Sequence, residues 1–372
     1  MSVLLKKQIF EGISQQELAQ QIESKKKCQK KLPSWFETQK IYYPKKINIE
    51  QTSSETTAQY KSKIVDGKSL LDLTGGLGID SYYFSKKIAS ISHCEIDENL
   101  HKITSHNYKI LRVDNIATFN KNGLKYLRNS NQNFDWLYLD PSRRNEVKGK
   151  VFKLSDCQPD VLENLELLFS KSENILIKTS PLLDISEGIK SLSGIKEIHT
   201  IAIQNDVKEL LWILKKGYSG EIAMKTINFT NSDIQKFDFT STEEQKTHSE
   251  YSLPLTFLYE PNAAILKSGA FKILGEKLNL QKLHSSTHLY TSNNLLNFPG
   301  RCFKVLALED YSTKKVKKLN IKKANITTRN FVDSVAQIRK RFKIKEGGKL
   351  FLLFFKNNLN KYQLAVCEKA SK

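Results

Sequence analysis

The stretch LLDLTGGLGIDS, residues 70–81, decides the predicted fold. A short apolar strand runs into Gly75, Gly76 and Gly78, and a helical pattern follows them directly. Glycines between a strand and a helix permit a tight turn and let a ligand approach the backbone closely. This arrangement is typical of the first strand–helix turn of a doubly wound α/β sheet.

Short apolar strands and longer helical stretches alternate on both sides of this loop. Helical stretches fill most of the gaps between the strands, which predicts an α/β domain with a mostly parallel, doubly wound sheet. A ligand should lie beyond the carboxyl ends of the strands of such a sheet. The expected strands are 69–74, 90–96, 115–119, 135–139, 174–179, 197–204 and 221–228.

Glu95 ends the second expected strand, 19 residues after Gly76, where a carboxylate can bind both hydroxyls of a ribose. NAD would place a pyrophosphate at the loop, but Asp72 and Asp80 would repel it, and Ser81 replaces the third glycine of the dinucleotide motif. S-adenosylmethionine has no phosphate and carries positive charges that carboxylates attract, so the loop favours this methyl donor. The alternative is a turn that binds nothing.

The expected cofactor-binding residues are Asp72, Thr74, Gly75, Gly76, Gly78, Asp80, Glu95, Asn122 and Gly123. Asn122 and Gly123 follow the third strand, where folds of this kind contact an adenine ring. An ordinary Asn-Gly turn explains these two residues as well.

The stretch FDWLYLDPSRRN, residues 134–145, ends the fourth strand at the same edge of the sheet. Asp140 and Pro141 should face the acceptor, while Arg143 and Arg144 are suited to binding a phosphate or carboxylate. Alternatively, Asp140 caps a turn and the arginines lie in a solvated loop. Lys178 and Ser180 end the fifth strand and could line the cleft or simply mark a strand exit.

Three regions are expected along the chain. A helical pattern covers residues 1–32, and the T-x-x-E spacing of Thr52 and Glu55 predicts a helix start. The polar segment 231–250 suggests a boundary, after which the pattern is α+β. We therefore expect an N-terminal helical region at 1–50, a Rossmann-like domain at 51–245 and an α+β region at 246–372.

The charge of the chain favours a polyanionic partner. The 372 residues carry a formal net charge of +20, and Lys and Arg are dense between Lys314 and Arg341. Because the excess is almost all lysine, compositional drift is the alternative explanation. The five cysteines form no C-x-x-C pair, which predicts no zinc site and no disulfide framework. Without a signal peptide or a long apolar run, we expect a cytoplasmic protein of unpredicted oligomeric state.

The glycine loop, Glu95 and the LDP of residues 139–141 resemble class I S-adenosylmethionine-dependent methyltransferases. In the amino-methylating branch the last motif continues with a proline and an aromatic residue that stacks on the base. Here Ser142 and Arg143 stand in those places, which weakens base N-methylation as the specific reaction.

Further segments are similar to a bacterial group of methyltransferases with a C-terminal THUMP-like domain. They are EQTSSETTAQYK, DPSRR, YEPNAAILKSGAFK, HLYTS, FPGRCFKV and KANITTRNF. The resemblance implies a methyltransferase that acts on RNA, either tRNA or rRNA. A methyltransferase of a protein or an anionic small molecule, and a non-catalytic RNA-binding protein, remain alternatives.

Overall fold

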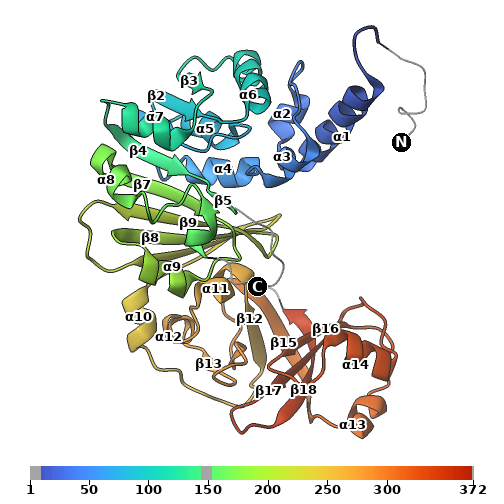
Figure 1. Ribbon diagram of the computed structural model, residues 1–372. Helices are drawn as coiled ribbons and strands as arrows, with labels where there is room; N and C mark the ends of the chain where they lie inside the picture. The colour runs from blue at the N-terminus through green and yellow to red at the C-terminus, as the bar shows by residue number, and fades with distance from the viewer. Residues whose placement is uncertain (1–9, 144–152, 371–372) are drawn as a thin grey trace. The chain divides into compact units, whose positions relative to one another are not determined.

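The computed structural model describes residues 10–143 and 153–370 (Figure 1). The chain divides into two compact units. The first comprises Met1–Lys196 and Leu210–Ser219, and the second comprises Glu197–Glu209 and Gly220–Lys372.

The sheet of the first unit has the strand order β9-β7-β4-β1-β2-β3. All neighbouring strands among β7, β4, β1, β2 and β3 are parallel, so the predicted Rossmann-like, mostly parallel sheet is confirmed. The strands are β1 (Ser69–Asp72), β2 (Ser90–Cys94), β3 (Ile116–Phe119), β4 (Phe134–Leu139), β7 (Ser172–Thr179) and β9 (Asp206–Lys215).

Helices connect these strands and cover the sheet (Figure 1). They are α5 (Ile79–Phe84), α6 (Glu98–Ile110), α7 (Gly123–Asn129), α8 (Leu165–Lys171) and α9 (Ile185–Ser191). A short ladder of β5 (Ser142–Arg143) and β6 (Cys157–Gln158) and the 3₁₀ turn Leu154–Asp156 lie between β4 and α8. Because parallel strands end at one edge, the turns after β1, β2, β4 and β7 meet there.

The gap between the expected strands 197–204 and 221–228 contains a strand that we did not predict, β9. This strand pairs antiparallel with β7, from Asn174 opposite Lys215 to Thr179 opposite Leu210. Its run LLWIL, residues 210–214, is buried, as is usual for a strand covered on both faces. A continuous apolar run of this length shows neither the strand nor the helix period, so periodicity alone could not assign it.

From residue 10 onward, four helices precede the sheet: α1 (Gln15–Lys31), α2 (Pro33–Glu37), α3 (Lys46–Gln51) and α4 (Glu55–Lys61). They share a hydrophobic core with the segment that follows β1, because Cys28, Trp35 and Ala58 pack in one cluster with Leu77 and Tyr83. The N-terminal helices are therefore packed directly on the element that carries the glycine loop.

The predicted capping box of Thr52 and Glu55 is wrong by two residues. Thr52 ends α3, and Ser54 caps α4 by accepting a hydrogen bond from the Thr57 amide at 3.2 Å. Glu55 instead accepts hydrogen bonds from the amide and the hydroxyl of Ser34. This arrangement leaves Ser53 in the short link between two helices, with only 4% of its surface exposed.

In the second unit, β8 (Ile195–Ile203) pairs parallel with β10 (Ala223–Phe229), which pairs antiparallel with β11 (Ile234–Thr240). The polar segment 231–250 thus contains β11 and helix α10 (Ser241–Lys246). The polar composition of the segment concealed the alternation of a strand, in which Phe237 and Phe239 are buried while Lys236 and Asp238 are exposed.

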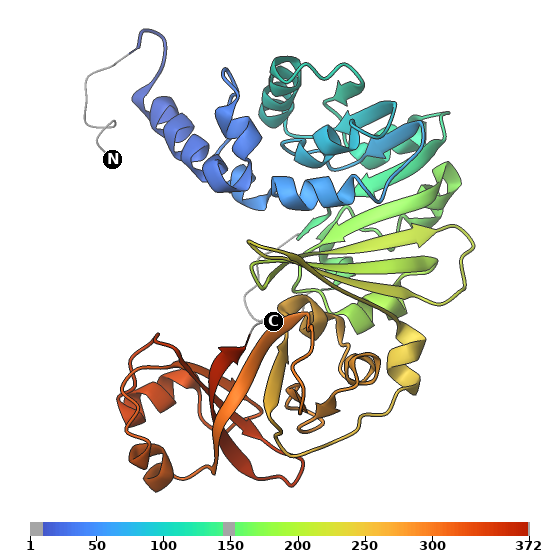
Figure 2. The same cartoon turned by 180° about the vertical axis from the view of Figure 1, so that it is seen from behind.

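A second sheet follows, drawn in orange to red in Figure 2. Its strand order is β13-β14-β12-β15-β18-β17-β16. Its strands are β12 (Phe257–Pro261), β13 (Gln281–Lys282), β14 (Tyr290–Ser292), β15 (Gly300–Asp310), β16 (Asn325–Arg329), β17 (Leu350–Lys356) and β18 (Tyr362–Ala370). The helices are α11 (Ala263–Ser268), α12 (Ile273–Leu278), α13 (Thr313–Lys318) and α14 (Val335–Phe342). The expected C-terminal α+β fold is confirmed. No helix among the described residues is both long and apolar enough to cross a membrane.

Candidate active site

The glycine loop after β1 rests on two buried rings, those of His93 and Tyr108. A Cβ atom on Gly75 would lie 2.2 Å from the His93 ring, and one on Gly78 would lie 2.0 Å from the Tyr108 hydroxyl. Gly78 also has φ +77°, and its carbonyl accepts a 2.9 Å hydrogen bond from that hydroxyl. No larger residue fits either position, so the loop presents bare backbone, as a close ligand approach requires.

Glu95 lies beside the loop, as its place after β2 predicts. One carboxylate oxygen accepts a 2.7 Å hydrogen bond from the Gly76 amide, and the other accepts a 2.7 Å bond from the Asp97 amide. Each oxygen keeps a second lone pair. Glu95 thus braces the loop and can still accept hydrogen bonds from two vicinal hydroxyls.

Asp72 lies below the loop, with 1% of its surface exposed. Its carboxylate accepts hydrogen bonds from the Thr74 amide at 3.0 Å and from the Ser81 hydroxyl at 2.6 Å. Burial raises the pKa of Asp72 to about 7, although these two hydrogen bonds act in the opposite direction. Burial also lowers the pKa of His93 to about 3, so this histidine is neutral at pH 7.

Asp140 follows β4 at the same edge of the sheet. Its amide donates a 2.7 Å hydrogen bond to the Thr74 hydroxyl, which ties the strand end to the glycine loop. Its carboxylate forms an ion pair with Lys178 at the end of β7, and 34% of the Asp140 side chain remains exposed. Burial raises the pKa of Asp140, and the charge of Lys178 opposes that shift.

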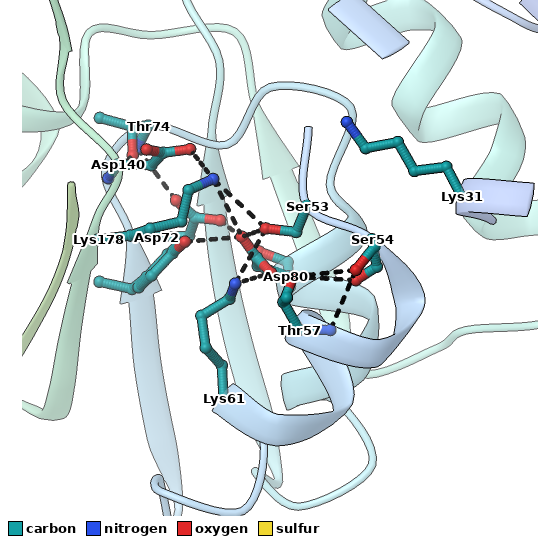
Figure 3. Close-up of polar contacts among 12 residues, drawn as sticks. Lys31, Ser53, Ser54, Thr57, Lys61, Asp72, Thr74, Asp80, Asp140 and Lys178 are labelled. Carbon is teal, nitrogen blue, oxygen red and sulfur yellow. Dashed lines mark hydrogen bonds and ion pairs between the residues drawn. The ribbon is translucent and has the colours of Figure 1, made fainter. Parts of the chain in front are cut away.

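Asp80, in the first turn of α5, is the centre of a buried polar network (Figure 3). Lys61 lies 3.2 Å from one oxygen of its carboxylate. The other oxygen accepts hydrogen bonds from the hydroxyls of Ser53 at 2.8 Å and Tyr138 at 2.6 Å. Burial acts to raise the pKa of Asp80, but the positive charges of Lys61 and Lys178 outweigh it and hold that pKa below its usual value.

This pairing changes the electrostatic basis of the cofactor prediction. We expected Asp72 and Asp80 to offer two negative charges at the loop, but the charge of Asp80 is balanced by Lys61 and Lys178. Asp72 has the pKa of a carboxyl that is partly protonated at pH 7. Glu95 and the bare loop backbone are therefore the groups best placed for a nucleoside.

Asn122 and Gly123 begin α7 beside the end of β1. The Asn122 side chain caps the helix by accepting a 3.0 Å hydrogen bond from the Lys125 amide. A Cβ atom on Gly123 would lie 2.2 Å from the Leu73 carbonyl oxygen, so glycine permits this close packing. A contact with adenine stays a prediction for both residues.

The other residues predicted to form the acceptor site are Pro141, Arg143, Arg144 and Ser180. Pro141 is buried next to Asp140, and the backbone of Arg143 pairs with Cys157 in the short β5–β6 ladder. The Ser180 hydroxyl accepts a 3.2 Å hydrogen bond from the Leu182 amide, which is a turn after β7. Arg144 lies outside the described residues. The described chain holds no group of His, Cys, Asp and Glu side chains arranged for a metal ion.

Sequence reasoning missed Ser53, Lys61, Ser81, His93 and Tyr108. Ser53 and Lys61 belong to EQTSSETTAQYK, one of the segments shared with the THUMP-like group. Lys61 is fully buried, but nothing in the sequence of a predicted helix shows that a lysine near its cap is buried. The one available signal for Ser53 and Lys61 was that both lie in a segment shared with the THUMP-like group.

In the second unit, two arginines of the C-terminal motifs bind a buried carboxylate. Glu260 accepts a 2.6 Å hydrogen bond from Arg301 and another of 2.6 Å from Arg329. Arg341 pairs with Asp333 at 2.6 Å, and Arg339 donates to the carbonyls of Ala324 and Ile344. Six lysines of this stretch are exposed: Lys314, Lys315, Lys317, Lys318, Lys322 and Lys323.

Comparisons with known proteins agree with this architecture. The sequence matches the model of a ferredoxin-like domain over residues 257–299 and that of a THUMP-like domain over residues 300–369. No curated protein matches the sequence. The structure is similar to the crystal structure of a protein from Porphyromonas gingivalis W83 described as a "putative methyltransferase". That similarity has a TM-score of 0.90 and 31% identity, over 99% of this chain and 94% of the other.

Two more distant matches involve less than half of the chain. An rRNA methylase from Streptococcus thermophilus has 14% identity and a TM-score of 0.33, over 43% of this chain and 94% of the other. TrmK from M. capricolum, solved with S-adenosylhomocysteine, has 18% identity and a TM-score of 0.35, over 44% and 70%. Both are too distant to bear on function. From the similarity over its whole length to the Porphyromonas protein, the chain belongs to the family of methyltransferases with a C-terminal THUMP-like domain.

Proposed function

We propose that the protein transfers a methyl group from S-adenosylmethionine to RNA, either tRNA or rRNA. The observation that carries the proposal is the hydrogen bond between the Asp140 amide and the Thr74 hydroxyl. It joins the residue expected to face the acceptor to the loop expected to bind the donor.

The residues around the loop fit the cofactor. Gly75 and Gly78 pack so closely on His93 and Tyr108 that the loop carries no side chain at either position, and Glu95 lies beside the Gly76 amide with lone pairs for ribose hydroxyls. Ser81 stands where the dinucleotide motif has its third glycine. These features favour S-adenosylmethionine over a dinucleotide. When bound, the cofactor supplies the activated methyl group.

The protein's part in the reaction is orientation and charge. Asp140, with its carboxylate partly exposed, accepts a hydrogen bond from the acceptor and can take up a proton that the acceptor loses. Lys178 stabilises the charged form of Asp140 through their ion pair. Arg143 and Arg144 hold a nearby phosphate, and Pro141 fixes the backbone beside Asp140.

RNA binding rests on the basic C-terminal region. The exposed lysines 314–323 offer positive charge to a phosphate backbone, and the whole chain carries a net charge of +20. In this proposal residues 1–50 and 51–245 form the helical region and the catalytic domain, and residues 246–372 deliver RNA. The protein then works where cellular RNA is, in the cytoplasm.

Two binding titrations test the proposal. Calorimetry should detect binding of S-adenosylmethionine and none of NAD under the same conditions. A filter-binding assay should detect RNA binding that competing polyanions such as heparin remove. Tight NAD binding would contradict the cofactor assignment. No RNA binding at all would favour a protein or small-molecule acceptor.

A further inference from the structure

Lys178 lies between two carboxylates that belong to different parts of the first unit. Its ammonium forms an ion pair with Asp140 and lies 4.0 Å from Asp80. Asp80 is the better supported anion, because the hydroxyls of Tyr138 and Ser53 donate to it. With no other cation near, the charge of Lys178 would be drawn toward Asp80 and away from Asp140.

Lys61 removes that competition. This lysine of α4 is fully buried, and its ammonium lies 3.2 Å from Asp80. A buried ammonium group is costly unless it is paired, and the Asp80 carboxylate is the partner of Lys61. Lys61 balances Asp80, and Lys178 remains available to Asp140.

The Ser53 hydroxyl fixes this division of charges. It donates to Asp80 at 2.8 Å and accepts from Lys61 at 2.9 Å and from Lys178 at 3.3 Å. A hydroxyl has one proton to donate and two lone pairs, so these contacts use its full capacity. Figure 3 shows the four side chains directed toward one another.

We propose that Ser53 and Lys61 are positioning residues of the acceptor site, which keep Lys178 paired with Asp140 by balancing the charge of Asp80. The proposal rests on the role of Asp140 proposed above. Under this proposal, the segment before β1 helps to maintain the ion pair of the Asp140 carboxylate, in addition to its part in the hydrophobic core.

The groups that act on Asp140 come from several elements. Lys178 of β7 and Lys61 of α4 favour its charged form, while Asp80 of α5 and burial oppose it. Lys61→Met removes one cation and leaves the charge of Asp80 to attract Lys178. Both effects raise the pKa of Asp140.

The test is a carbon-13 NMR titration of the Asp140 carboxyl in the full-length protein without cofactor or RNA. In Lys61→Met the pKa of Asp140 should rise measurably, because Asp80 loses its own cation and draws the charge of Lys178 away from Asp140. Ser53→Ala should produce a smaller rise. In the double variant Lys61→Met/Asp80→Asn both competing charges are gone, so the pKa should return to the wild-type value.

Lys27→Met is the matched control, because Lys27 is also a lysine of the N-terminal helices in an ion pair, with Glu50 at 2.9 Å. It should leave the Asp140 titration unchanged. In methyl-transfer assays at pH 7, Lys61→Met should lower kcat with KM for RNA unchanged, and the double variant should recover kcat. If Lys61→Met does not fold, Ser53→Ala and the double variant decide the question.

An unchanged Asp140 pKa in Lys61→Met or Ser53→Ala would overturn the proposal, as would a double variant whose pKa is still raised. Lys61 and Ser53 would then serve only the stability of the fold. Because the titration needs no turnover, it remains informative if no variant methylates RNA, which would count against the proposed function instead.

Discussion

Glu95 is the residue on which cofactor affinity should depend most. Glu95→Gln keeps the size of the side chain but removes the charge that supports the Gly76 amide and the ribose hydroxyls. We expect S-adenosylmethionine binding to weaken by about 1–3 kcal/mol, the usual loss when a charged hydrogen-bond partner is removed. Calorimetry measures the change. Glu98→Gln, at an exposed carboxylate that pairs with Lys102, is the control and should bind as wild type does. Equal affinities for the two variants would contradict the role of Glu95.

Asp140 should affect turnover far more than cofactor binding. Asp140→Asn removes the proton acceptor and the partner of Lys178, and its contact with the acceptor matters most in the transition state. We expect kcat to fall by about 10²-fold or more, the contribution typical of a general base. The dissociation constant for S-adenosylmethionine should stay within about twofold. Asp206→Asn, at an exposed aspartate, is the control for both measurements. Unchanged turnover would move the acceptor site away from Asp140.

The buried Asp72 makes stability depend on pH. Its pKa is raised to about 7, so its contribution is fully present below the unfolded-state pKa near 4 and is lost as the pH rises through 7. The free energy of unfolding should fall by roughly 4 kcal/mol over this range relative to Asp72→Asn. Denaturant titrations from pH 4 to pH 8 measure this difference. Asp66→Asn, at an exposed aspartate, should follow wild type throughout. Parallel curves for wild type and Asp72→Asn would show that Asp72 is not the titrating group.

At the residue scale, sequence predicted the positions that depend on strand ends. Asp72, Glu95, Asp140 and Lys178 each lie within one residue of the end of a strand, so their meeting at one edge follows from the parallel sheet. Partners that come from outside this pattern could not be predicted. Lys61 joins the site because α4 packs beside α5, and that contact depends on tertiary packing rather than local periodicity.

At the scale of elements, all seven expected strands are present, because each combines a short apolar run with a turn or helix signal. The strands missed were the ones that break the strand–helix alternation. β9 follows β8 through a turn with Gln204 and Asn205 at positive φ, and no helix separates the two strands. Parallel strands need a long crossover connection, and this turn is too short for one. The antiparallel direction of β9 therefore follows from the turn.

Helix α13 is the element that should contribute most to salt-dependent RNA binding. Lys314, Lys317 and Lys318 are exposed, whereas Arg339 and Arg341 already bind carbonyls or a carboxylate. Replacing the three lysines with glutamine should reduce the slope of log K against log salt by about 2–3, since each phosphate contact contributes about 0.7–0.9. The same change at Lys25, Lys26 and Lys30, exposed on α1, is the control. Equal slopes for the two triple variants would mean that the lysines reflect composition only.

At the scale of the whole molecule, the two units are interleaved in sequence, which decides how the protein can be dissected. The second unit includes residues 197–209 and 220–250 as well as the family-matched segments. Within it, the Ala263 amide donates to Asn205 at 2.8 Å, and Asn262 donates to Gln235 at 3.1 Å. A truncation after residue 250 would therefore remove partners of Asn205 and Gln235. Point substitutions in the full-length chain are the sounder test of RNA binding.

The central claim is that this chain methylates RNA at an acceptor site formed by Asp140. The most direct measurement incubates the full-length protein with methyl-labelled S-adenosylmethionine and RNA from cells that lack the protein, followed by digestion to nucleosides. We predict label in one modified nucleoside with wild type, none with Asp140→Asn, and wild-type labelling with the Asp206→Asn control. Label found in protein or small molecules instead of RNA, or equal labelling of RNA by Asp140→Asn, would contradict the claim.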